Sequence, residues 1–460
     1  MMVDTVIDGG RIVTPHRTFH GSVAIDDGEI VGITDPGGAP SADRTIDATD
    51  RLILPGVVDP HVHIDALLPE RAGDYQTETA AAARGGVTTV IDFAWQGGDR
   101  RLADPDATLL DGIAHKREQT AKAHIDTSVH GVLHRDDPAT FDAVADAVDA
   151  GVTSFKMFRS TYDSGVDTGF LVDAFEAIAE QDAVALVHAE DPEVCDRHAA
   201  RAREAGRTAA TEYPATRPDY SEAMALDSAL HLARVAGVKY YAVHTTARLS
   251  AATLARFQTD RSRVRGETCT HYTVLDESAH ERQGNLPKIA PPLRTPDDIE
   301  AMFERLRDET LSVVSTDHVP FPRAAKETDT WWDAAFGCNS LQRSLPLFHE
   351  AAVVQRGHSL PFLVRKMCAN PADTFGLPQK GTLEPGTDAD IVIFDPERTQ
   401  EISADTNASA ADYSIYEGRT VHGAVDAVFL RGNRIVANGQ LVGDPGDGEF
   451  LERSIPDWDA

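Results

Sequence analysis

Cysteine is scarce in this chain, and its few copies are scattered. Cys195, Cys269, Cys338 and Cys368 lie far apart, and no two of them form a CxxC pair. This spacing excludes a zinc ribbon or a disulfide framework and favours a reducing cytoplasm. Long apolar runs are also missing, and "MMVDTVIDGG" has no basic stretch followed by an apolar core. We therefore expect a cytoplasmic protein that is neither secreted nor inserted in a membrane.

Positive charge is in short supply as well. Lys and Arg number 43 against 74 Asp and Glu, which gives a formal net charge of −31. Such an excess repels nucleic acids and anionic membranes and favours a small, neutral or metal-bound ligand. Lysine is a small minority of the basic residues, and acidic residues are spread along the whole chain. We interpret this pattern as halophilic, an adaptation to concentrated salt; an ordinary acidic protein is the alternative.

What the chain has in plenty is an alternation of short apolar segments with alanine-rich helical ones. Its 460 residues, 42% of them hydrophobic, suffice for a large core and a smaller module. The β-like segments are "GVVDPHVHI", "TTVIDFA", "DTSVHGV", "TSFKMF", "VALVHAE", "KYYAVHTT", "RVRGETCTHY" and "LSVVSTDH". Intervening stretches such as "SEAMALDSALHLARVAG" have the apolar spacing of amphipathic helices and end in glycine. The alternation predicts an α/β fold with a (β/α)8 TIM-like barrel over residues 55–377.

The two flanks of this region have a different character. Residues 1–54 contain "DTVIDGGRIV" and "GSVAIDDGEIVGI", and residues 378–460 contain "DADIVIFDP" and "AVDAVFLRGNRIVANGQLV". Both are rich in β-formers and glycine turns and contain no convincing helix. Neither flank has enough strands to be stable alone. We therefore predict that both ends of the chain meet in one composite β-sandwich beside the barrel.

Residues that can bind metal stand at or just past the carboxyl ends of the predicted barrel strands, where barrel enzymes place their reacting groups. His61 and His63 follow the first strand, and residues two apart on a strand face the same way. The fifth, sixth and eighth strands end near His188, His244 and Asp317. A lone HxH is a weak signal. Five such residues at matching positions favour a metal site, since imidazole and carboxylate are the usual zinc ligands.

Lys156 in "SFKMF" ends the fourth strand of the same set. Burial lowers the pKa of a lysine and leaves a neutral amine, although a lysine extending to solvent from a strand end is the alternative. A neutral amine can take up carbon dioxide to form a carbamate, whose two oxygens can each hold a metal ion. We predict that carboxylated Lys156 bridges two divalent ions. The predicted ligands are His61, His63 and Asp317 for one ion and His188 and His244 for the other.

Two ions about 3.5 to 4 Å apart would lower the pKa of a water between them and polarise a substrate carbonyl. Asp317 could then accept the proton of the attacking hydroxide and pass it to a leaving nitrogen. The chemistry predicted from these residues is therefore hydrolysis of an amide.

Several motifs together resemble one family along essentially the whole chain. "PGVVDPHVHID", "SFKMF", "LVHAED", "ETCTHYTVLDES", "APPLR", "STDHVPF", "NPADTFGL" and "KGTLEPGTDADIVIFDP" are similar to the hydantoinase and dihydropyrimidinase branch of the cyclic amidohydrolases. The resemblance implies a barrel with two Zn²⁺ ions and N6-carboxylysine at Lys156. It also implies opening of dihydropyrimidine or hydantoin rings to N-carbamoyl amino acids, a place in pyrimidine catabolism, and a homotetramer or homodimer.

The resemblance also implies substrate contacts. Asn339 in "GCNSLQRS" stands where the family has an asparagine that binds the ring, and Ala290 before "PPLR" stands where relatives often have serine and where main-chain groups bind the ring. Relatives carry an oxyanion-stabilising tyrosine five residues after the lysine, where this chain has Thr161; a one-residue insertion would bring Tyr162 to that role. Arg159 and Ser160 also depart from the family pattern, so the side group of the substrate stays open.

Rival functions differ in what they require. Dihydroorotase relatives place an arginine two residues after the second histidine to hold a carboxylate, whereas this chain has Asp65, which would repel one. Allantoinase remains an alternative, because its substrate ring and its metal ligands are similar to those of the hydantoinase branch. A mononuclear metallodeaminase has no need of Lys156, and a non-enzymatic scaffold that has lost its ligands is disfavoured because none is missing.

The remaining polar residues near the strand ends are interpreted as supporting groups. We expect His271 and His318 to pack around the ligands or orient them. Glu190 and Asp92 are candidates for orienting the metal-binding imidazoles.

Overall fold

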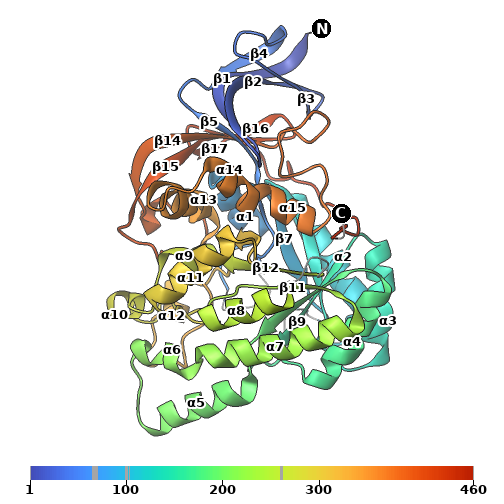
Figure 1. Ribbon diagram of the computed structural model, residues 1–460, viewed down its shortest axis with the longest axis vertical. Coiled ribbons are helices and arrows are strands. Elements are labelled where there is room, and N and C mark those ends of the chain that lie inside the picture. Colours follow the sequence, from blue (N-terminus) through green and yellow to red (C-terminus); the bar gives the residue numbers. More distant parts are fainter. Residues whose placement is uncertain (1, 65–70, 99–101, 103, 259–262, 459–460) are drawn as a thin grey trace.

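The computed structural model describes residues 2–64, 71–98, 102, 104–258 and 263–458. Its larger part is a barrel of eight parallel strands covered by helices, and its smaller part is a sheet built from both ends of the chain (Figure 1). The barrel strands are β6 (Val57–Asp59), β7 (Val87–Ala94), β8 (Asp126–Val132), β9 (Ser154–Arg159), β10 (Val184–Ala189), β11 (Lys239–Ala242), β12 (Val264–Cys269) and β13 (Val313–Ser315). Each strand coincides with one of the eight predicted segments to within a residue or lies inside it, so the predicted barrel is confirmed.

The barrel is closed next to the predicted site. Parallel pairing runs in chain order from β6 to β13. Val62, just after β6, forms a parallel bridge with His318, just after β13, and the His63 N–H donates to the His318 carbonyl at 2.8 Å. The segments that carry His61 and Asp317 therefore lie side by side.

The helices around the barrel begin at residues able to cap them. The carboxylates of Asp74, Asp137 and Asp167 each accept a hydrogen bond from the backbone N–H three residues on, which satisfies a free donor of the first turn. The helices that alternate with the barrel strands are α1 (Tyr75–Arg84), α2 (Leu109–Gln119), α3 (Pro138–Asp149), α4 (Thr168–Glu180), α7 (Asp219–Ala236), α8 (Arg248–Phe257) and α11 (Pro296–Arg307).

Further helical segments lie in the connections and after the barrel. They are η1 (Thr120–Lys122), α5 (Pro192–Glu204), η2 (Ala210–Glu212), α6 (Tyr213–Thr216), α9 (Thr270–Val274), α10 (Ala279–Gln283), α12 (Arg323–Lys326), η3 (Leu341–Arg343), α13 (Ser344–Phe348), η4 (His349–Val354), α14 (Leu360–Val364), η5 (Arg365–Ala369), α15 (Asn370–Thr374) and η6 (Ala404–Thr406). Within the described part of the chain, no helix combines the length and apolar character that a membrane crossing needs.

The second sheet joins the two ends of the chain. Its strands are β1 (Val3–Val13), β2 (Thr18–Asp26), β3 (Glu29–Thr34), β4 (Ala42–Asp47), β5 (Leu52–Pro55), β14 (Ile391–Glu401), β15 (Thr420–Leu430), β16 (Asn433–Ala437) and β17 (Gln440–Leu441). β5 pairs with β1 on one side and with β14 on the other, so it connects the N-terminal strands to the C-terminal ones. This is the composite β domain that the flanks predict.

The core of this domain is shared by both ends of the chain. Ile7, Val23 and Ile53 pack with Ile391 and Phe429 in one buried cluster. Burial of apolar surface from both ends supplies what neither end has alone. The exact domain limits at residues 54 and 377 stay a prediction.

The last residues of the chain leave this sheet and pack along the barrel. The Leu451 N–H donates to the Thr127 carbonyl at 2.7 Å, and the Thr127 N–H donates to the Glu449 carbonyl at 2.8 Å. Arg453 is buried and donates to the Val129 carbonyl at 2.6 Å. The C-terminal segment thereby holds β8 from outside the barrel sheet.

Candidate metal centre and active site

A cavity of about 600 Å³ opens at the carboxyl ends of the barrel strands. Its described lining includes every residue predicted to hold metal: His61, His63, Lys156, His188, His244 and Asp317. These side chains come from five different strand ends, and only the closed barrel brings them together.

The two histidines of the HxH motif approach Asp317 from the segment after β6. His61 Nε2 lies 3.3 Å and His63 Nε2 lies 3.2 Å from Asp317 Oδ1. The other ring nitrogen of His61, Nδ1, lies 2.6 Å from Glu267 Oε1 on β12. This contact fixes the orientation of the His61 ring and leaves Nε2 facing the cluster.

His188 and His244 form the opposite side of the cluster. Their ring centroids are 4.6 Å apart, and the His244 ring lies 5.4 Å from that of His61. His188 Nε2 lies 2.9 Å from Glu190 Oε2, so its Nδ1 is the nitrogen left for a ligand. Burial lowers the pKa of both imidazoles, which favours the neutral form that binds metal.

Asp317 is the acidic centre of the cluster. Burial by itself raises the pKa of its carboxyl group, but the neighbouring His61 and His63 outweigh burial and hold the pKa well below its usual range. Asp317 and His244 both have a positive φ, 44° and 38°. Backbone of this kind is strained for residues other than glycine, and its occurrence at two strand ends is typical of functional sites.

Lys156 lines the same cavity from β9. Its side chain is completely buried, and Nζ has no hydrogen-bond partner among the described residues. The nearest groups include the rings of Phe93 and Phe158, whose centroids are 5.4 and 5.2 Å from Nζ. Burial lowers the pKa of the Lys156 amine to about 8. The alternative that Lys156 extends to solvent is therefore excluded.

The residues fit a metal centre. Ligand atoms of His61, His244 and Asp317 all lie within 4.8 Å of one another. Lys156 Nζ and His61 Nε2 are buried and have no hydrogen-bond partner in the described part of the chain, an arrangement that is costly unless a ligand supplies the missing contact.

A second cluster of acidic groups has a different explanation. Asp126, Asp388 and Asp390 also converge. Lys380 Nζ lies among them, 2.5, 2.7 and 2.9 Å from their carboxylates. The ammonium group already occupies the place of a cation, so this cluster joins the barrel to the second sheet.

Comparison with known proteins fits this geometry. The model of the amidohydrolase family matches residues 52–435. The chain belongs to the amidohydrolase family. It is 34% identical to a D-hydantoinase of Streptomyces coelicolor and 30% identical to an allantoinase of Salmonella newport, in each case over 98% of this chain and at least 98% of the relative. The crystal structure of dihydropyrimidinase from Brevibacillus agri superposes with a TM-score of 0.93 at 31% identity, covering 98% of this chain and 99% of that one.

The substrate side of this amidohydrolase is only partly as predicted. Tyr162 and Ala290 line the cavity, and the Tyr162 ring lies 5.3 Å from that of His188. Thr161 is instead held by Arg217, whose Nη2 donates to Thr161 Oγ1 at 2.8 Å. Tyr162, and not Thr161, therefore lines the cavity.

Asn339 is placed behind the wall of the cavity. It is buried, it is not among the residues described as lining the cavity, and its Nδ2 donates to the Tyr413 carbonyl at 2.7 Å. The nearby residues that do line the cavity are Phe336 and Gly337. A direct contact of Asn339 with substrate stays a prediction that this placement does not support. Asp65, on which the argument against dihydroorotase depends, lies outside the described residues.

The supporting residues differ in part from expectation. Glu190 contacts His188, as predicted. Asp92 accepts a hydrogen bond from the Ile64 N–H at 3.3 Å and one from Lys116 Nζ at 2.7 Å; it therefore holds the chain after His63 and contacts no imidazole that the structure describes. His318 Nε2 lies 2.8 Å from Glu78 Oε2, which agrees with a supporting role.

Glu267 was missed by sequence reasoning. It is completely buried. Its Oε1 accepts from the His244 N–H at 3.1 Å in addition to its contact with His61, and its Oε2 accepts from the Tyr241 hydroxyl at 2.9 Å. One carboxylate therefore orients residues of both predicted ligand sets. The available signal was an acid within "RGETC", a segment otherwise suited to a buried strand.

Proposed function

We propose that this amidohydrolase opens the ring amide of dihydropyrimidines or hydantoins to give N-carbamoyl amino acids. The observation that carries the proposal is the buried, unpartnered amine of Lys156, which lines the same cavity as the four histidines, and this cavity is large enough for a small ring. Similarity over nearly the whole chain to a D-hydantoinase and a dihydropyrimidinase supports the same substrate class.

The family generally uses a binuclear metal centre, and we assign its ligands here. His61, His63 and Asp317 would hold one ion, His188 and His244 the other, and a carboxylated Lys156 would bridge them. Carboxylation joins the nitrogen of the neutral amine to the carbon of CO₂ and releases one proton, so a neutral group becomes an anion. The donor set suits Zn²⁺. When bound, the two ions would lower the pKa of a water and polarise the substrate carbonyl.

The chain's own residues perform the remaining tasks. Asp317, held ionised by the neighbouring imidazoles, accepts a proton and delivers it to the leaving ring nitrogen. Tyr162 extends into the cavity and can donate its hydroxyl hydrogen to the oxygen that gains negative charge. Glu267 and Glu190 hold the rings of His61 and His188 in their metal-binding orientation.

Allantoinase activity is the second candidate. It is favoured by the allantoinase relatives, which are 30% identical over 98% of the chain. Allantoin is a hydantoin that carries a side group, so the same ligands serve either reaction, and the walls of the cavity decide between them.

A substrate panel tests the proposal. Zinc-loaded protein prepared with bicarbonate is assayed for ring loss with dihydrouracil, hydantoin, substituted hydantoins, allantoin and dihydroorotate. We expect turnover of dihydrouracil or the hydantoins, with Lys156→Ala as the inactive control. Turnover of allantoin alone would establish the second candidate, and turnover of dihydroorotate alone would overturn both.

We further propose that this protein forms a homotetramer or homodimer that works in the cytoplasm in pyrimidine catabolism. We also propose that it is adapted to high salt. The chemistry of the substrate class and the family likeness support the first proposal, and the formal charge of −31 supports the second.

A further inference from the structure

Two buried lysines hold one wall of the cavity, the segment 333–337. Lys326 at the end of α12 is completely buried. Its Nζ donates to the carbonyls of Lys288 at 2.6 Å, Ala335 at 3.0 Å and Gly337 at 2.6 Å. An ammonium group has three N–H donors, so all of them are used, and two of them hold the wall segment.

Lys288 supports the same segment from the other side. Its side chain is almost completely buried. Its Nζ donates to the Ala334 carbonyl and lies 4.0 Å from the centroid of the Phe336 ring. Its own carbonyl also accepts from the Gly337 N–H at 3.1 Å. The main chain of the wall is therefore held at the carbonyls of Ala334, Ala335 and Gly337 and at the Gly337 N–H, and the Phe336 ring is held by a cation–π contact.

The chemistry of these two lysines differs from that of the other buried lysines. Every lysine except Lys122 is buried. Those outside the metal site and the wall each pair with a carboxylate: Lys116, Lys239, Lys366 and Lys380. Across the described residues, neither Lys288 nor Lys326 forms a salt bridge. A buried cation without a counter-ion is costly, so its retention at the wall of the cavity calls for a role there.

The wall connects these lysines to the reacting groups. The Phe336 ring lies 5.9 Å from the Tyr162 ring, which lies 5.3 Å from His188. Gly337 has a φ of 138°, and an added Cβ would lie 2.5 Å from the Cβ of Val319. The wall is thus fitted closely between its supports and the cavity, where a small shift would move Phe336 relative to Tyr162.

We propose that Lys288 and Lys326 are positioning residues that hold the wall segment 333–337 and thereby set which ring side groups the cavity accepts. The proposal rests on the proposed function for its substrates. Neither amine touches the substrate; each acts through the wall, on Phe336 and on the neighbouring main chain.

The three acceptors of Lys326 require the ammonium form, since a neutral amine has one donor fewer. Burial lowers the pKa of Lys326 and of Lys288 to about 7, and the mutual repulsion of the two amines adds to the shift of Lys288. Other titratable or charged groups facing them are Cys338 at Lys326, Arg203, Arg217, Tyr213 and Asp333 at Lys288, and His280 at both. The interactions of the two ammonium groups with the wall therefore weaken as the pH rises through about 7.

The first test needs no turnover. Amide hydrogen exchange is measured on peptides covering 330–340 in Lys326→Met, Lys288→Met and the matched control Lys366→Met, a buried lysine that pairs with Glu309. We expect exchange of the wall peptide to rise about tenfold or more in the two wall variants and to be unchanged in the control. Equal exchange in all three proteins would overturn the proposal, and failure of every ring substrate would overturn only the proposed function.

The second test measures selectivity. The ratio of kcat/KM for hydantoin to that for benzyl-substituted hydantoin is compared among the same variants, with zinc content checked in each. We expect the ratio to move toward one by about tenfold in the wall variants, because a loosened apolar wall discriminates less, and to keep its value in the control. A ratio within about twofold of the unmodified enzyme in both wall variants would overturn the proposal.

The third test covers the case in which the variants do not fold. In the unmodified enzyme the same ratio is followed from pH 6 to pH 9. Both substrates share the catalytic groups, so the pH dependence of catalysis cancels in the ratio. We expect discrimination to fall as the pH rises through about 7, and a ratio independent of pH would contradict the role of the ammonium groups.

Discussion

Lys156 shows how one buried amine can decide the chemistry of a site. It reaches no carboxylate or carbonyl that the structure describes, so its position is costly unless it is modified or neutral. Burial lowers its pKa to about 8, whereas an exposed lysine stays near 10.4. About a tenth of this amine is therefore neutral at pH 7, against less than about a thousandth of an exposed one.

This shift predicts how metal-free protein regains activity. The neutral amine attacks CO₂, so at a fixed concentration of dissolved CO₂ reactivation in the presence of zinc should become about five- to tenfold faster between pH 7 and pH 9 and level off above about pH 8. The measurement is the rate at which activity returns after chelation, with Lys156→Ala as a control that stays inactive at every pH. A rate that keeps rising tenfold per pH unit up to pH 10 would show an amine of ordinary pKa.

Tyr162 and Thr161 allow a test at neighbouring residues. Tyr162 lines the cavity, and Thr161 is held by Arg217 outside it. Loss of one oxyanion donor costs about a hundredfold or more in kcat, so we expect Tyr162→Phe to lose that much and Thr161→Ala to lose less than about tenfold. The measurement is kcat and KM for hydantoin in both variants. The reverse order of effects would return the oxyanion role to Thr161.

At the scale of elements, five barrel strand ends supply the predicted metal-binding side chains, and the loops decide what surrounds them. β12 supplies Glu267, which orients His61 in the segment after β6 and the main chain of His244 after β11. The segment after β13 supplies Asp317, which is placed beside His61 and His63 because the Val62–His318 bridge closes the barrel. The site is therefore as rigid as the barrel ends that form it.

The contact between barrel and second sheet predicts a stability effect. Lys380 pairs with Asp126 of β8 and with Asp390 just before β14, and all three are buried. Neutralising one partner leaves buried charges uncompensated, which costs about 3 to 5 kcal/mol. We expect Lys380→Met to lower the free energy of unfolding by that amount, measured by urea denaturation.

The matched control for this change is an exposed ion pair. Arg305 and Asp308 form one at the C-terminal end of α11 with both side chains at least 32% exposed, and such pairs contribute about 0 to 1 kcal/mol. Arg305→Met should therefore change stability very little. Equal effects of the two substitutions would show that the cluster around Lys380 does not hold the two parts together.

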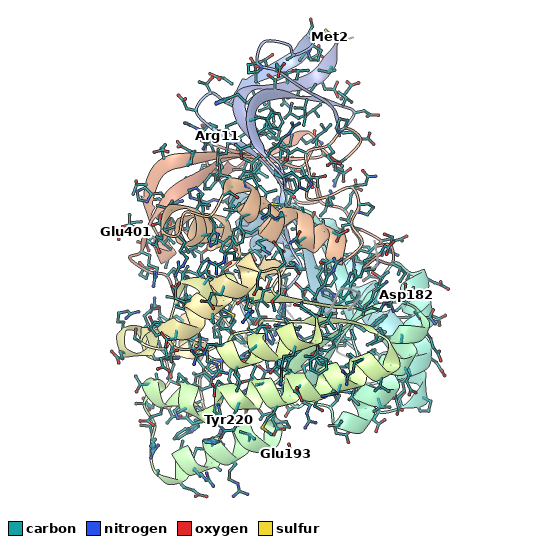
Figure 2. The ribbon with its side chains drawn as sticks, viewed as in Figure 1. Met2, Arg11, Asp182, Glu193, Tyr220 and Glu401 are labelled. Carbon is teal, nitrogen blue, oxygen red and sulfur yellow. The ribbon has the colours of Figure 1, made fainter. Side chains whose placement is uncertain are left out.

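At the scale of the whole molecule, negative charge dominates the surface. Asp182, Glu193 and Glu401 lie at different edges of the molecule (Figure 2), and their side chains are largely exposed. The lysines cannot offset this charge, since all but Lys122 are buried. Repulsion among the surface carboxylates therefore acts over the whole protein at low salt.

This surface predicts that salt stabilises the protein. Raising KCl from about 0.1 M to 1 M shortens the screening length from about 10 Å to 3 Å, so the melting temperature should rise by about 5 °C or more. Sucrose serves as the control, because it stabilises proteins by being excluded from their surface but adds no ionic strength. A melting temperature that stays flat or falls with KCl would contradict adaptation to salt.

Much of this architecture is predictable from the chain alone. Eight apolar segments alternating with helical ones predict the barrel, because each parallel strand needs a crossover helix. The positions of His61, His188 and His244 at strand ends predict the site, because parallel strands end at one face. Asp92 and Asn339 show the limit: their roles depend on the direction of a side chain, which neighbours far along the chain decide.

The sequence by itself determined the class of fold, the gathering of the predicted metal-binding residues at one end of the barrel and the negative charge, because these follow from local pattern and composition. Only the tertiary structure decided that Tyr162, and not Thr161, lines the cavity, that Glu267 contacts both the His61 ring and the main chain of His244, and that Lys288 and Lys326 contact the wall beside Phe336. These relations join residues that are distant in the chain, and their free energy depends on distance and burial, which no local pattern encodes.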